Sequence, residues 1–327
     1  MVLNKEQIAA IARGVARVEE ENGWFRLLRF TEAQAQSYLD AGHPEFYNKT
    51  FATAGVRLAF RTNSRSFSMQ YRFDKGSSRT YAWFDVYVNG AMTLHFGSEG
   101  SSVKSACATI NLGEGEKDVE IYFPWSRNAE LSEVTLDDGA MLTPIHRKRK
   151  MICFGDSITH GYDAIYPSLS YACGVARLLD ADMTDKGIGG DRFCPYMLRD
   201  ADPEAPDVIT VAYGTNDWGG DTLENFKTNC LAFFQRLHEL YPNARIFAIS
   251  PIWRGDGENK NRFGMPAREV HDLMAELCKG IPNVTMINGW NLVPHRQAFY
   301  SDFFLHPNDL GFALYSQNLY KSIMNVD

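Results

Sequence analysis

Several features that mark large classes of protein are missing from this 327-residue sequence. It has no excess of positive charge, because 33 lysine and arginine residues stand against 40 aspartate and glutamate residues, for a net charge of −7. That balance disfavours nucleic acid and anionic membranes as partners. The N-terminal stretch "MVLNKEQIAAIARGVARVEEENGW" also lacks the long apolar run that a signal peptide or a membrane span requires. We therefore expect a cytoplasmic protein that binds neither nucleic acid nor membrane.

The cysteines form no recognisable binding pattern. They are widely spaced, without a C-x-x-C pair, at Cys107, Cys153, Cys173, Cys194, Cys230 and Cys278. In a chain without a secretion signal such cysteines are expected to stay reduced, and their spacing disfavours a zinc site. The glycine-rich stretch "KGIGGDRF" lacks both the G-x-G-x-x-G order and the lysine of a phosphate-binding loop. We expect neither a metal nor an organic cofactor.

The first part of the chain has the apolar spacing of β-strands. From about residue 55 to 142 apolar residues alternate with polar ones, as in "RSFSMQYRF" and "FDVYVNGAMTLHF". Asn89-Gly90 predicts a tight hairpin, "INLGEGEKDVEIYFP" predicts another, and Asp138-Gly139 a further turn. This pattern predicts a β-sandwich (jelly-roll) domain over residues 31–147.

Two segments frame that domain. Residues 1–30 are expected to form an N-terminal helical segment on the surface. The basic run "HRKRK", residues 146–150, interrupts the strand pattern, and such runs are usually solvated linkers. We take it as the domain boundary.

Residues 148–327 change to alternating strands and helices. "MICF", "DVITVAY", "ARIFAIS" and "NVTMIN" have the character of short buried strands. Amphipathic stretches lie between them at Leu169–Leu179, Leu223–Tyr241 and Pro266–Lys279. Strands that alternate with helices predict an α/β domain whose parallel sheet is covered on both faces. Ligands of such sheets bind beyond the carboxyl ends of the strands.

Three of these strand ends carry groups suited to catalysis. "FGDSITHG" presents the hydroxyl of Ser157, although serine is also a common helix N-cap. "KGIGGDRF" offers the main-chain N–H of Gly190 to a developing negative charge, or forms a plain turn. "AYGTNDWGG" offers the side-chain amide of Asn216, although Asn-Asp is frequent in turns.

The last loop of the chain supplies a base. "SDFFLHPND" contains Asp302 and His306, and the proline that follows His306 keeps this segment out of a helix interior. A hydroxyl nucleophile, a base and donors for an oxyanion make a complete set for acyl transfer.

Together these stretches resemble a known family. "GDSIT", "GIGGD", "GTND" and "LHPND", in this order over residues 150–327, resemble the four blocks of the SGNH (GDSL-type) hydrolases. A β-sandwich before such a domain is similar to the arrangement in carbohydrate esterase family 2 and related two-domain acetyl esterases. The resemblance implies a three-layer α/β/α, flavodoxin-like hydrolase domain. By matching position it implies that Ser157 is the nucleophile and His306 its general base. The main-chain N–H groups of Ser157 and Gly190 and the side chain of Asn216 would then form the oxyanion hole.

The acidic member departs from the family pattern. The family usually places it three residues before the histidine, where this chain has Phe303, and Asp302 lies four residues before His306. Residues four apart face one another in a helical turn, but in an extended segment they are about 13 Å apart. Either the loop coils so that Asp302 orients His306, or a main-chain carbonyl does so and a Ser–His dyad operates. His160 and His295 are rivals for the base, although we expect each to be a partly exposed surface residue.

The predicted function is that of a serine esterase. It would hydrolyse short-chain acyl esters, acetyl esters above all, and deacetylate a carbohydrate through an acyl-enzyme. Trp218 and Trp253 follow strand ends and would line the pocket, since indole rings stack well on sugars. Two alternatives remain: a thioesterase or lipase for longer acyl chains, and a carbohydrate-binding protein with an inactive hydrolase domain. The partner is expected to be a small-molecule or oligosaccharide ester, and homo-oligomer formation is left open.

Overall fold

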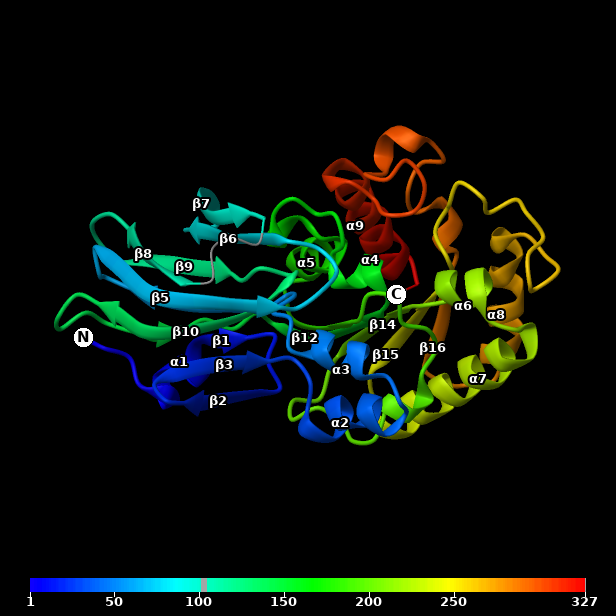
Figure 1. The fold of residues 1–327 in the computed structure, drawn as a ribbon, viewed down its shortest axis with the longest axis horizontal. Helices are drawn as coiled ribbons and strands as arrows, with labels where there is room; N and C mark the ends of the chain where they lie inside the picture. Colours follow the sequence, from blue (N-terminus) through cyan, green and yellow to red (C-terminus); the bar gives the residue numbers. More distant parts are fainter. Residues whose placement is uncertain (101–104, 327) are drawn as a thin grey trace.

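The computed structural model describes residues 1–100 and 105–326. In it, two antiparallel sheets occupy one end of an elongated molecule and a parallel sheet with helices occupies the other (Figure 1). We call residues 12–144 the β region and residues 149–326 the α/β region.

The β region contains two antiparallel sheets. One has the strand order β1-β4-β9-β6-β7, with β11 paired to β4, and the other has the order β2-β3-β10-β5-β8. The strands of the first sheet are β1 (Ala12–Arg13), β4 (Arg57–Thr62), β6 (Tyr81–Val88), β7 (Ala91–Glu99), β9 (Lys117–Tyr122) and β11 (Thr143–Pro144). Those of the second are β2 (Arg17–Glu21), β3 (Trp24–Leu28), β5 (Ser66–Lys75), β8 (Ser105–Asn111) and β10 (Arg127–Leu136).

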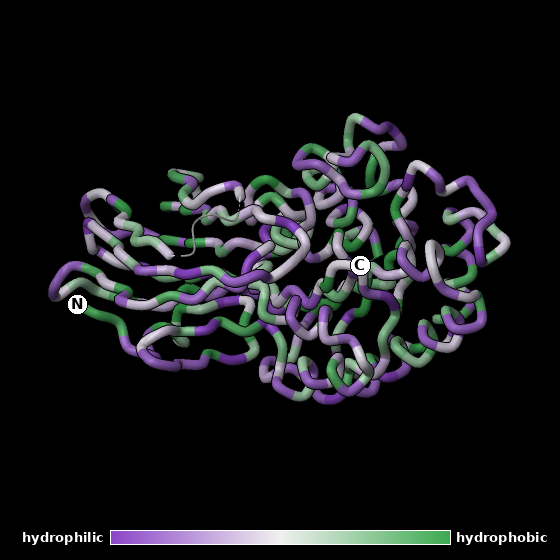
Figure 2. Tube along the Cα trace, viewed as in Figure 1, coloured by the Kyte–Doolittle hydropathy of each residue, from purple (hydrophilic) through white to green (hydrophobic). Residues whose placement is uncertain are grey.

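The two sheets share one hydrophobic core. Alternate residues of β5, Phe67 and Met69 among them, are buried in the same cluster as Phe84 and Val86 of β6. The alternation is visible along these strands as changing hydropathy (Figure 2). Between about residues 55 and 142 the period-two pattern therefore predicted strands correctly, because strands such as β5 turn one side toward the shared core and the other away from it.

One predicted hairpin is confirmed and another is wrong. Asn89 and Gly90, both at positive φ, join β6 to β7. The stretch "INLGEGEKDVEIYFP" does not form a hairpin, because β8 pairs with β5 while β9 pairs with β4 and β6 in the other sheet. Alternation shows that a segment is a strand, but it carries no information about which sheet the strand joins.

The N-terminal segment is helical only in part. Helix α1 (Lys5–Ile11) begins with a capping box at Asn4 and ends at Ala12. Residues 12–28, which we predicted to be helical, instead supply β1, β2 and β3. The turn between β2 and β3 has Asn22 and Gly23 at positive φ. Strand β2 lies at the edge of its sheet, has no fully buried residue and is mostly charged. Its sequence therefore lacks the alternation of apolar and polar residues from which a strand is predicted.

The α/β region is built on a five-stranded parallel sheet with the order β13-β12-β14-β15-β16. Its strands are β12 (Arg149–Gly155), β13 (Ala181–Gly187), β14 (Val208–Ala212), β15 (Arg245–Ile249) and β16 (Val284–Ile287). Its α-helices are α4 (Ser157–His160), α5 (Tyr171–Leu178), α6 (Thr215–Gly220), α7 (Leu223–Leu240), α8 (Val270–Cys278) and α9 (Asp309–Met324). Short 3-10 helices lie at η1 (Pro167–Leu169), η2 (Pro195–Met197), η3 (Ala267–Glu269), η4 (Gly289–Asn291) and η5 (Gln297–Phe299).

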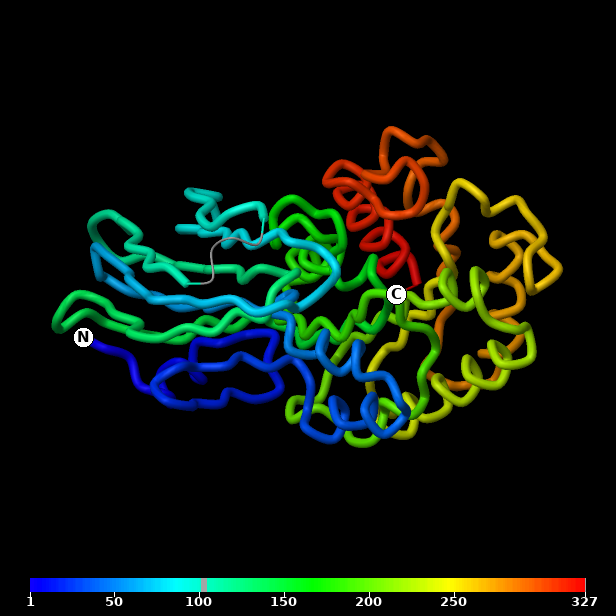
Figure 3. Tube along the Cα trace, viewed as in Figure 1, coloured from blue at the N-terminus to red at the C-terminus, as the bar shows by residue number. Residues whose placement is uncertain are grey.

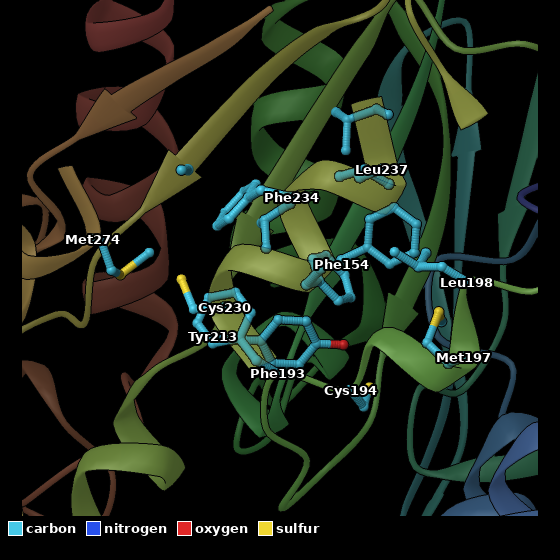
Figure 4. Packing of buried hydrophobic residues seen from close by; sticks show 14 of the residues in the cluster. Phe154, Phe193, Cys194, Met197, Leu198, Tyr213, Cys230, Phe234, Leu237 and Met274 are labelled. Atoms are coloured by element: carbon cyan, nitrogen blue, oxygen red, sulfur yellow. The ribbon is translucent and has the colours of Figure 1, made fainter. Parts of the chain in front are cut away.

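Helices cover both faces of this sheet, as predicted. Ile152 and Phe154 of β12 pack into one core with α7 and α8, while Met151 and Cys153 face the opposite core with α5 and α9. Figure 4 shows Phe154 close to Phe234 and Leu237 of α7. No helix within the described residues is both long and apolar enough to cross a membrane.

Two helices from the N-terminal part of the chain pack on the α/β region. These are α2 (Glu32–Asp40) and α3 (Pro44–Thr50), seen as the blue segment beside the parallel sheet in Figure 3. The hydroxyl of buried Tyr38 donates to Asp191 at 2.7 Å, and Tyr38 belongs to the core of the α/β region. Residues 32–50, which we predicted to be the start of the β-sandwich domain, therefore pack on the α/β region instead.

The basic run at the junction is only in part a solvated linker, because His146, Lys148 and Arg149 are exposed whereas Arg147 and Lys150 are half-buried. Nη2 of Arg147 donates to both carboxylate oxygens of Glu120, at 2.9 and 3.0 Å, and Lys150 pairs with Glu204 at 2.8 Å. His146 lies 3.8 Å from Asp182. The charges hold the two regions together, because their acidic partners come from both sides of the junction. A run of like charges cannot reveal partners that are distant in sequence.

Candidate active site

Ser157 lies at the first position of α4, directly beyond β12. Asp156 caps this short helix by accepting a hydrogen bond from Ile158 N at 2.9 Å. The Ser157 hydroxyl is therefore free of the capping role and lies 2.9 Å from Nε2 of His306. The predicted hydroxyl and the predicted base meet across 149 positions of sequence.

Asp302 completes a chain of contacts behind His306. Its Oδ2 lies 2.8 Å from His306 Nδ1, and its Oδ1 accepts hydrogen bonds from the main-chain N–H groups of Phe304, Leu305 and His306. Phe303 turns the chain with a positive φ of 57°. The loop therefore coils around the carboxylate and brings Asp302 into contact with His306, as in the first of the two arrangements considered.

The environment of Asp302 favours its ionised form. Burial alone would raise its pKa, but the hydrogen bonds from His306 and from the main chain of Leu305 and Phe304 outweigh it, so the pKa lies well below its usual range. A carboxylate at this position holds the Nδ1 proton of a neutral imidazole and leaves Nε2 free to accept a proton from Ser157.

A second carboxylate lies near the base. Asp163 Oδ2 is 4.0 Å from His306 Nδ1 and accepts a hydrogen bond from Ser301 Oγ at 2.7 Å. Arg79, from the loop between β5 and β6, donates to Asp163 Oδ1 at 2.6 Å. The ring of Tyr162 stacks on His306 at 5.9 Å between centroids. Sequence reasoning missed Asp163 and Arg79, because neither lies in a motif and Arg79 is far from the site in sequence.

These side chains also form a group that could hold a metal. Within the described part of the chain, Asp163, Asp302 and His306 offer ligand atoms within 4.8 Å of one another. The same atoms already accept hydrogen bonds or contact each other, and the Arg79 guanidinium lies against Asp163. A positive charge at that distance repels a cation, so the arrangement suits a hydrogen-bonded base better than a metal.

Gly190 lies on the loop that follows β13, and Asn216 is the second residue of α6, which follows β14. The final residues of β12, β13 and β14 are register partners, so the loops that follow them start at one edge of the sheet. Gly190 has a φ of 91°, a backbone conformation open to glycine and costly for other residues. Asn216 Nδ2 donates one hydrogen bond to Asp191 O at 2.8 Å, which ties the start of α6 to the loop of Gly190. Among the described residues no acceptor is found for the second N–H of this amide, which is therefore able to donate to a ligand.

Trp218 does not line a pocket. Its side chain is 1% exposed, its indole N–H donates to Met265 O at 2.9 Å, and Arg254 covers its ring at 4.8 Å. The predicted sugar contact is wrong, because α6 turns this residue into the core. Trp253 is only half-buried and packs against Tyr300 and His295 at 5.0 and 6.1 Å between ring centroids.

The rival histidines are both engaged elsewhere. His160 is fully buried, against our expectation of a surface residue, and its Nε2 lies 2.9 Å from Trp125 O. Burial lowers the pKa of His160 well below its usual value, so it stays neutral. His295 Nε2 lies 2.7 Å from Trp290 O. His306 is the histidine whose ring nitrogen meets Ser157.

A cavity of about 500 Å³ adjoins the site. It is lined mainly by polar and charged side chains, namely Glu45, Asn48, Lys49, Asp74, Lys75, Ser77, Ser78 and Asn128, together with Phe51 and Gly76. Ser78 lies 3.4 Å from Tyr162 OH, and Lys49 donates to Gly189 O at 2.5 Å. A second cavity, of about 470 Å³, surrounds Arg13 and Asp182 and has none of the catalytic candidates in its lining. The lining of the first cavity contains no catalytic candidate either, but the contacts of Ser78 and Lys49 connect it to the site, so it is the better candidate for a substrate subsite.

Several acids of the motifs are buried. Burial raises the pKa of Asp156 and of Asp217 to about 7 and that of Asp191 to about 6. Asp217 Oδ1 accepts a hydrogen bond from Phe193 N at 3.2 Å, while its Oδ2 has no partner within the described structure. These carboxyls brace the loops rather than reach the solvent.

Residues 153–314 match the model of the GDSL-like lipase/acylhydrolase family. None of the curated proteins matches the chain.

Solved structures resemble the chain over most of its length. Salicylyl-acyltransferase SsfX3 from a tetracycline biosynthetic pathway has a TM-score of 0.81 and 26% identity over 96% of this chain and 94% of its own. A putative GDSL-like lipase from Bacteroides ovatus has a TM-score of 0.75 and 18% identity over 100% and 97%. A family two carbohydrate esterase from Clostridium thermocellum, in complex with cellohexaose, has a TM-score of 0.66 and 20% identity over 84% and 93%. The last two similarities establish a common fold.

Replacing Asp217 by asparagine should stabilise the protein increasingly as the pH rises. The folded-state pKa of Asp217, about 7, lies above the value of about 3.9 for an unfolded aspartate. The wild type therefore loses stability as the pH rises above the unfolded value, because its buried carboxyl resists ionisation, whereas the amide of the variant does not titrate. We expect the variant's advantage in unfolding free energy, measured by urea denaturation, to grow by up to about 4 kcal/mol between about pH 4 and pH 8.

Asp272→Asn is the matched control, because that carboxylate is 88% exposed. Its effect on the unfolding free energy should not change with pH by more than about 0.5 kcal/mol. An advantage of Asp217→Asn that stays constant or shrinks as the pH rises would contradict the raised pKa.

Proposed function

Since residues 153–314 of this chain belong to the GDSL-like lipase/acylhydrolase family, which makes it a carboxylic ester hydrolase, we propose that it removes short-chain acyl groups, acetyl above all, from a carbohydrate. The observation that carries the esterase chemistry is the line of contacts from Ser157 Oγ through the His306 ring to Asp302, at 2.9 and 2.8 Å. It joins a hydroxyl, a base and an orienting carboxylate in one path for proton transfer.

The proposed mechanism has two half-reactions. His306 Nε2 takes the proton of Ser157 as its oxygen attacks the ester carbonyl, and the imidazolium then gives that proton to the leaving alcohol. Water attacks the resulting acyl-enzyme with the same base, which releases the carboxylic acid and restores Ser157. The N–H groups of Ser157 and Gly190 and the amide of Asn216 stabilise the tetrahedral oxyanion in both halves.

The polar cavity supports a carbohydrate substrate. Its lining offers hydroxyl, amide and charged groups that hydrogen-bond well to sugar hydroxyls, whereas a long acyl chain would need an apolar channel. Similarity to a carbohydrate esterase that was solved with cellohexaose points the same way. We propose that the sugar occupies this cavity and that half-buried Trp253 contacts the acyl side.

The β region is proposed to be a jelly-roll β-sandwich that forms a wall of the site. Arg79 reaches Asp163 beside the base, and Ser78 contacts Tyr162. These contacts favour a structural part of the catalytic centre over a separate carbohydrate-binding module attached to an inactive domain.

Ser157→Ala should abolish hydrolysis of p-nitrophenyl acetate, because the acyl-enzyme cannot form without the hydroxyl oxygen. Release of p-nitrophenolate by the purified protein measures the rate. Ser105→Ala, at the exposed start of β8, is the control and should keep the wild-type rate. More than a few per cent of activity in Ser157→Ala would remove the assignment of the nucleophile.

Asp302→Asn should lower kcat by about 10³- to 10⁴-fold. If the amide oxygen accepts from His306 Nδ1, it holds the proton there less firmly than a carboxylate does. If the amide nitrogen donates to Nδ1 instead, the imidazole proton must lie on Nε2. The latter tautomer cannot accept the serine proton. Asp163→Asn, which lies farther from the ring at 4.0 Å, should cost about tenfold or less. A loss below about tenfold for Asp302→Asn would mean that the site works as a Ser–His dyad.

Acyl transfer is a second candidate, favoured by the 26% identity to an acyltransferase over 96% of this chain. Phe303, 64% exposed in the loop of His306, could contact an aromatic acyl group. A panel of acetylated sugars, p-nitrophenyl esters of rising chain length and added alcohol acceptors separates the alternatives. We expect acetyl esters to be cleaved fastest, with water the main acceptor. An optimum at eight carbons or more would favour a lipase or thioesterase, and ester products in excess of free acid would favour a transferase.

A further inference from the structure

A lysine from outside the hydrolase-like motifs contacts the peptide group that carries the Gly190 N–H. Lys49, on α3, donates from Nζ to Gly189 O at 2.5 Å. Gly189 O and Gly190 N belong to one planar peptide unit, whose resonance links the charge on the oxygen to the polarity of the N–H. A positive charge on the oxygen therefore acts on the donor at the other end.

The direction of this effect favours catalysis. A cation at the carbonyl stabilises the charge-separated form of the amide, and the N–H becomes a stronger donor because hydrogen-bonded dipoles polarise one another. Donors fixed before the reaction stabilise a developing oxyanion without reorganisation. Lys49 thus adds positive charge behind the Gly190 N–H, where negative charge develops in the proposed reaction.

The position of Lys49 is well defined. Its ammonium lies 5.0 Å from the centroid of the Phe46 ring, and its main-chain carbonyl accepts a hydrogen bond from the buried guanidinium of Arg29 at 3.1 Å. The Phe46 ring also lies 3.5 Å from the place that a Cβ on Gly190 would occupy. Helix α3 therefore packs against the loop that contains Gly189 and Gly190, which we call the oxyanion loop.

The charge of Lys49 is not cancelled by an ion pair. Across residues 1–100 and 105–326, no carboxylate lies within 4.0 Å of its ammonium, whereas buried Lys186 lies 2.5 Å from Asp202. A lysine that served only to hold α3 against the loop would be more strongly stabilised by an ion pair with a carboxylate. Its one strong acceptor in that part of the chain is instead the carbonyl of the oxyanion-loop peptide.

We propose that Lys49 is a positioning residue of the oxyanion hole, which orients and polarises the Gly189–Gly190 peptide through its carbonyl oxygen. The proposal rests on the acyl-transfer function proposed for Ser157. It assigns to an N-terminal helix a part in the chemistry of the α/β region.

Three substitutions in the full-length protein separate charge from mere tethering. Lys49→Met removes both the charge and the hydrogen bond, Lys49→Gln keeps a donor without charge, and Lys49→Arg keeps both. With p-nitrophenyl acetate we expect kcat to fall about tenfold for Met, to fall less for Gln and to stay within about threefold for Arg, with KM within about twofold throughout. Lys227→Met, on the exposed side of α7, is the control and should leave kcat unchanged.

A tetrahedral inhibitor gives a readout that a structural role would not move. A boronic acid forms an anionic adduct with the serine and uses the oxyanion hole, so it should bind about tenfold more weakly to Lys49→Met than to the wild type. Acetate, a ground-state product, should bind both proteins alike. Thermal unfolding of each variant verifies that the fold is kept.

Equal losses in Lys49→Arg and Lys49→Met, or a Met variant within about twofold of wild-type kcat and boronate affinity, would overturn the inference. Weaker binding of acetate and boronate by the same factor would also overturn it, because it would indicate a distorted site. If one of these results is obtained and Ser157→Ala still abolishes the wild-type activity, the esterase function is retained and only the role of Lys49 is rejected. Without Ser157-dependent activity both fall together.

Discussion

A buried guanidinium joins the parts from which the site is made. Arg29 is inaccessible to solvent, and burial lowers its pKa to about 10. It donates to Ala52 O and Lys49 O on one side and to Asp185 O and Gly187 O of β13 on the other. A buried charge is costly unless its donors are satisfied, so these carbonyls must keep their places around it. The end of β13, from which the Gly190 loop starts, is thereby fixed against α3.

The proposed active site is consequently a composite of both regions. Three strand ends and the C-terminal loop supply Ser157, Gly190, Asn216 and His306, as in an ordinary parallel α/β sheet with its ligand site at one edge. The N-terminal part of the chain adds side chains behind them: Arg79 at the carboxylate near the base, and α3 over the oxyanion loop. In the proposed mechanism the N-terminal part of the chain acts on the chemistry through position and charge, and the reacting groups come from the α/β region.

Features of the fold that are set by residues close together in sequence could be predicted, whereas features set by contacts between distant segments could not. The parallel strands and their helices were predictable because both periodicities are strong, and Ser157 and His306 because their motifs lie at strand and loop ends. Trp218 was misassigned because the turn of α6, which buries it, is set by packing with Arg254 and Met265. The sheet partners of β8 and β9, and the approach of Arg79, depend on contacts between distant segments that no local pattern records. The coil at Asp302 was left open for the same reason, since three main-chain N–H groups define it.

In this composite site we propose that His306 activates Ser157 as a nucleophile. Covalent trapping tests it most directly: the protein is treated with an organophosphate ester such as diethyl p-nitrophenyl phosphate, and the modified peptide is identified by mass spectrometry. We expect stoichiometric release of p-nitrophenolate and one phosphoryl group on Ser157, with labelling lost in a His306→Ala variant. A label on another residue, or equal labelling with and without His306, would contradict the claim.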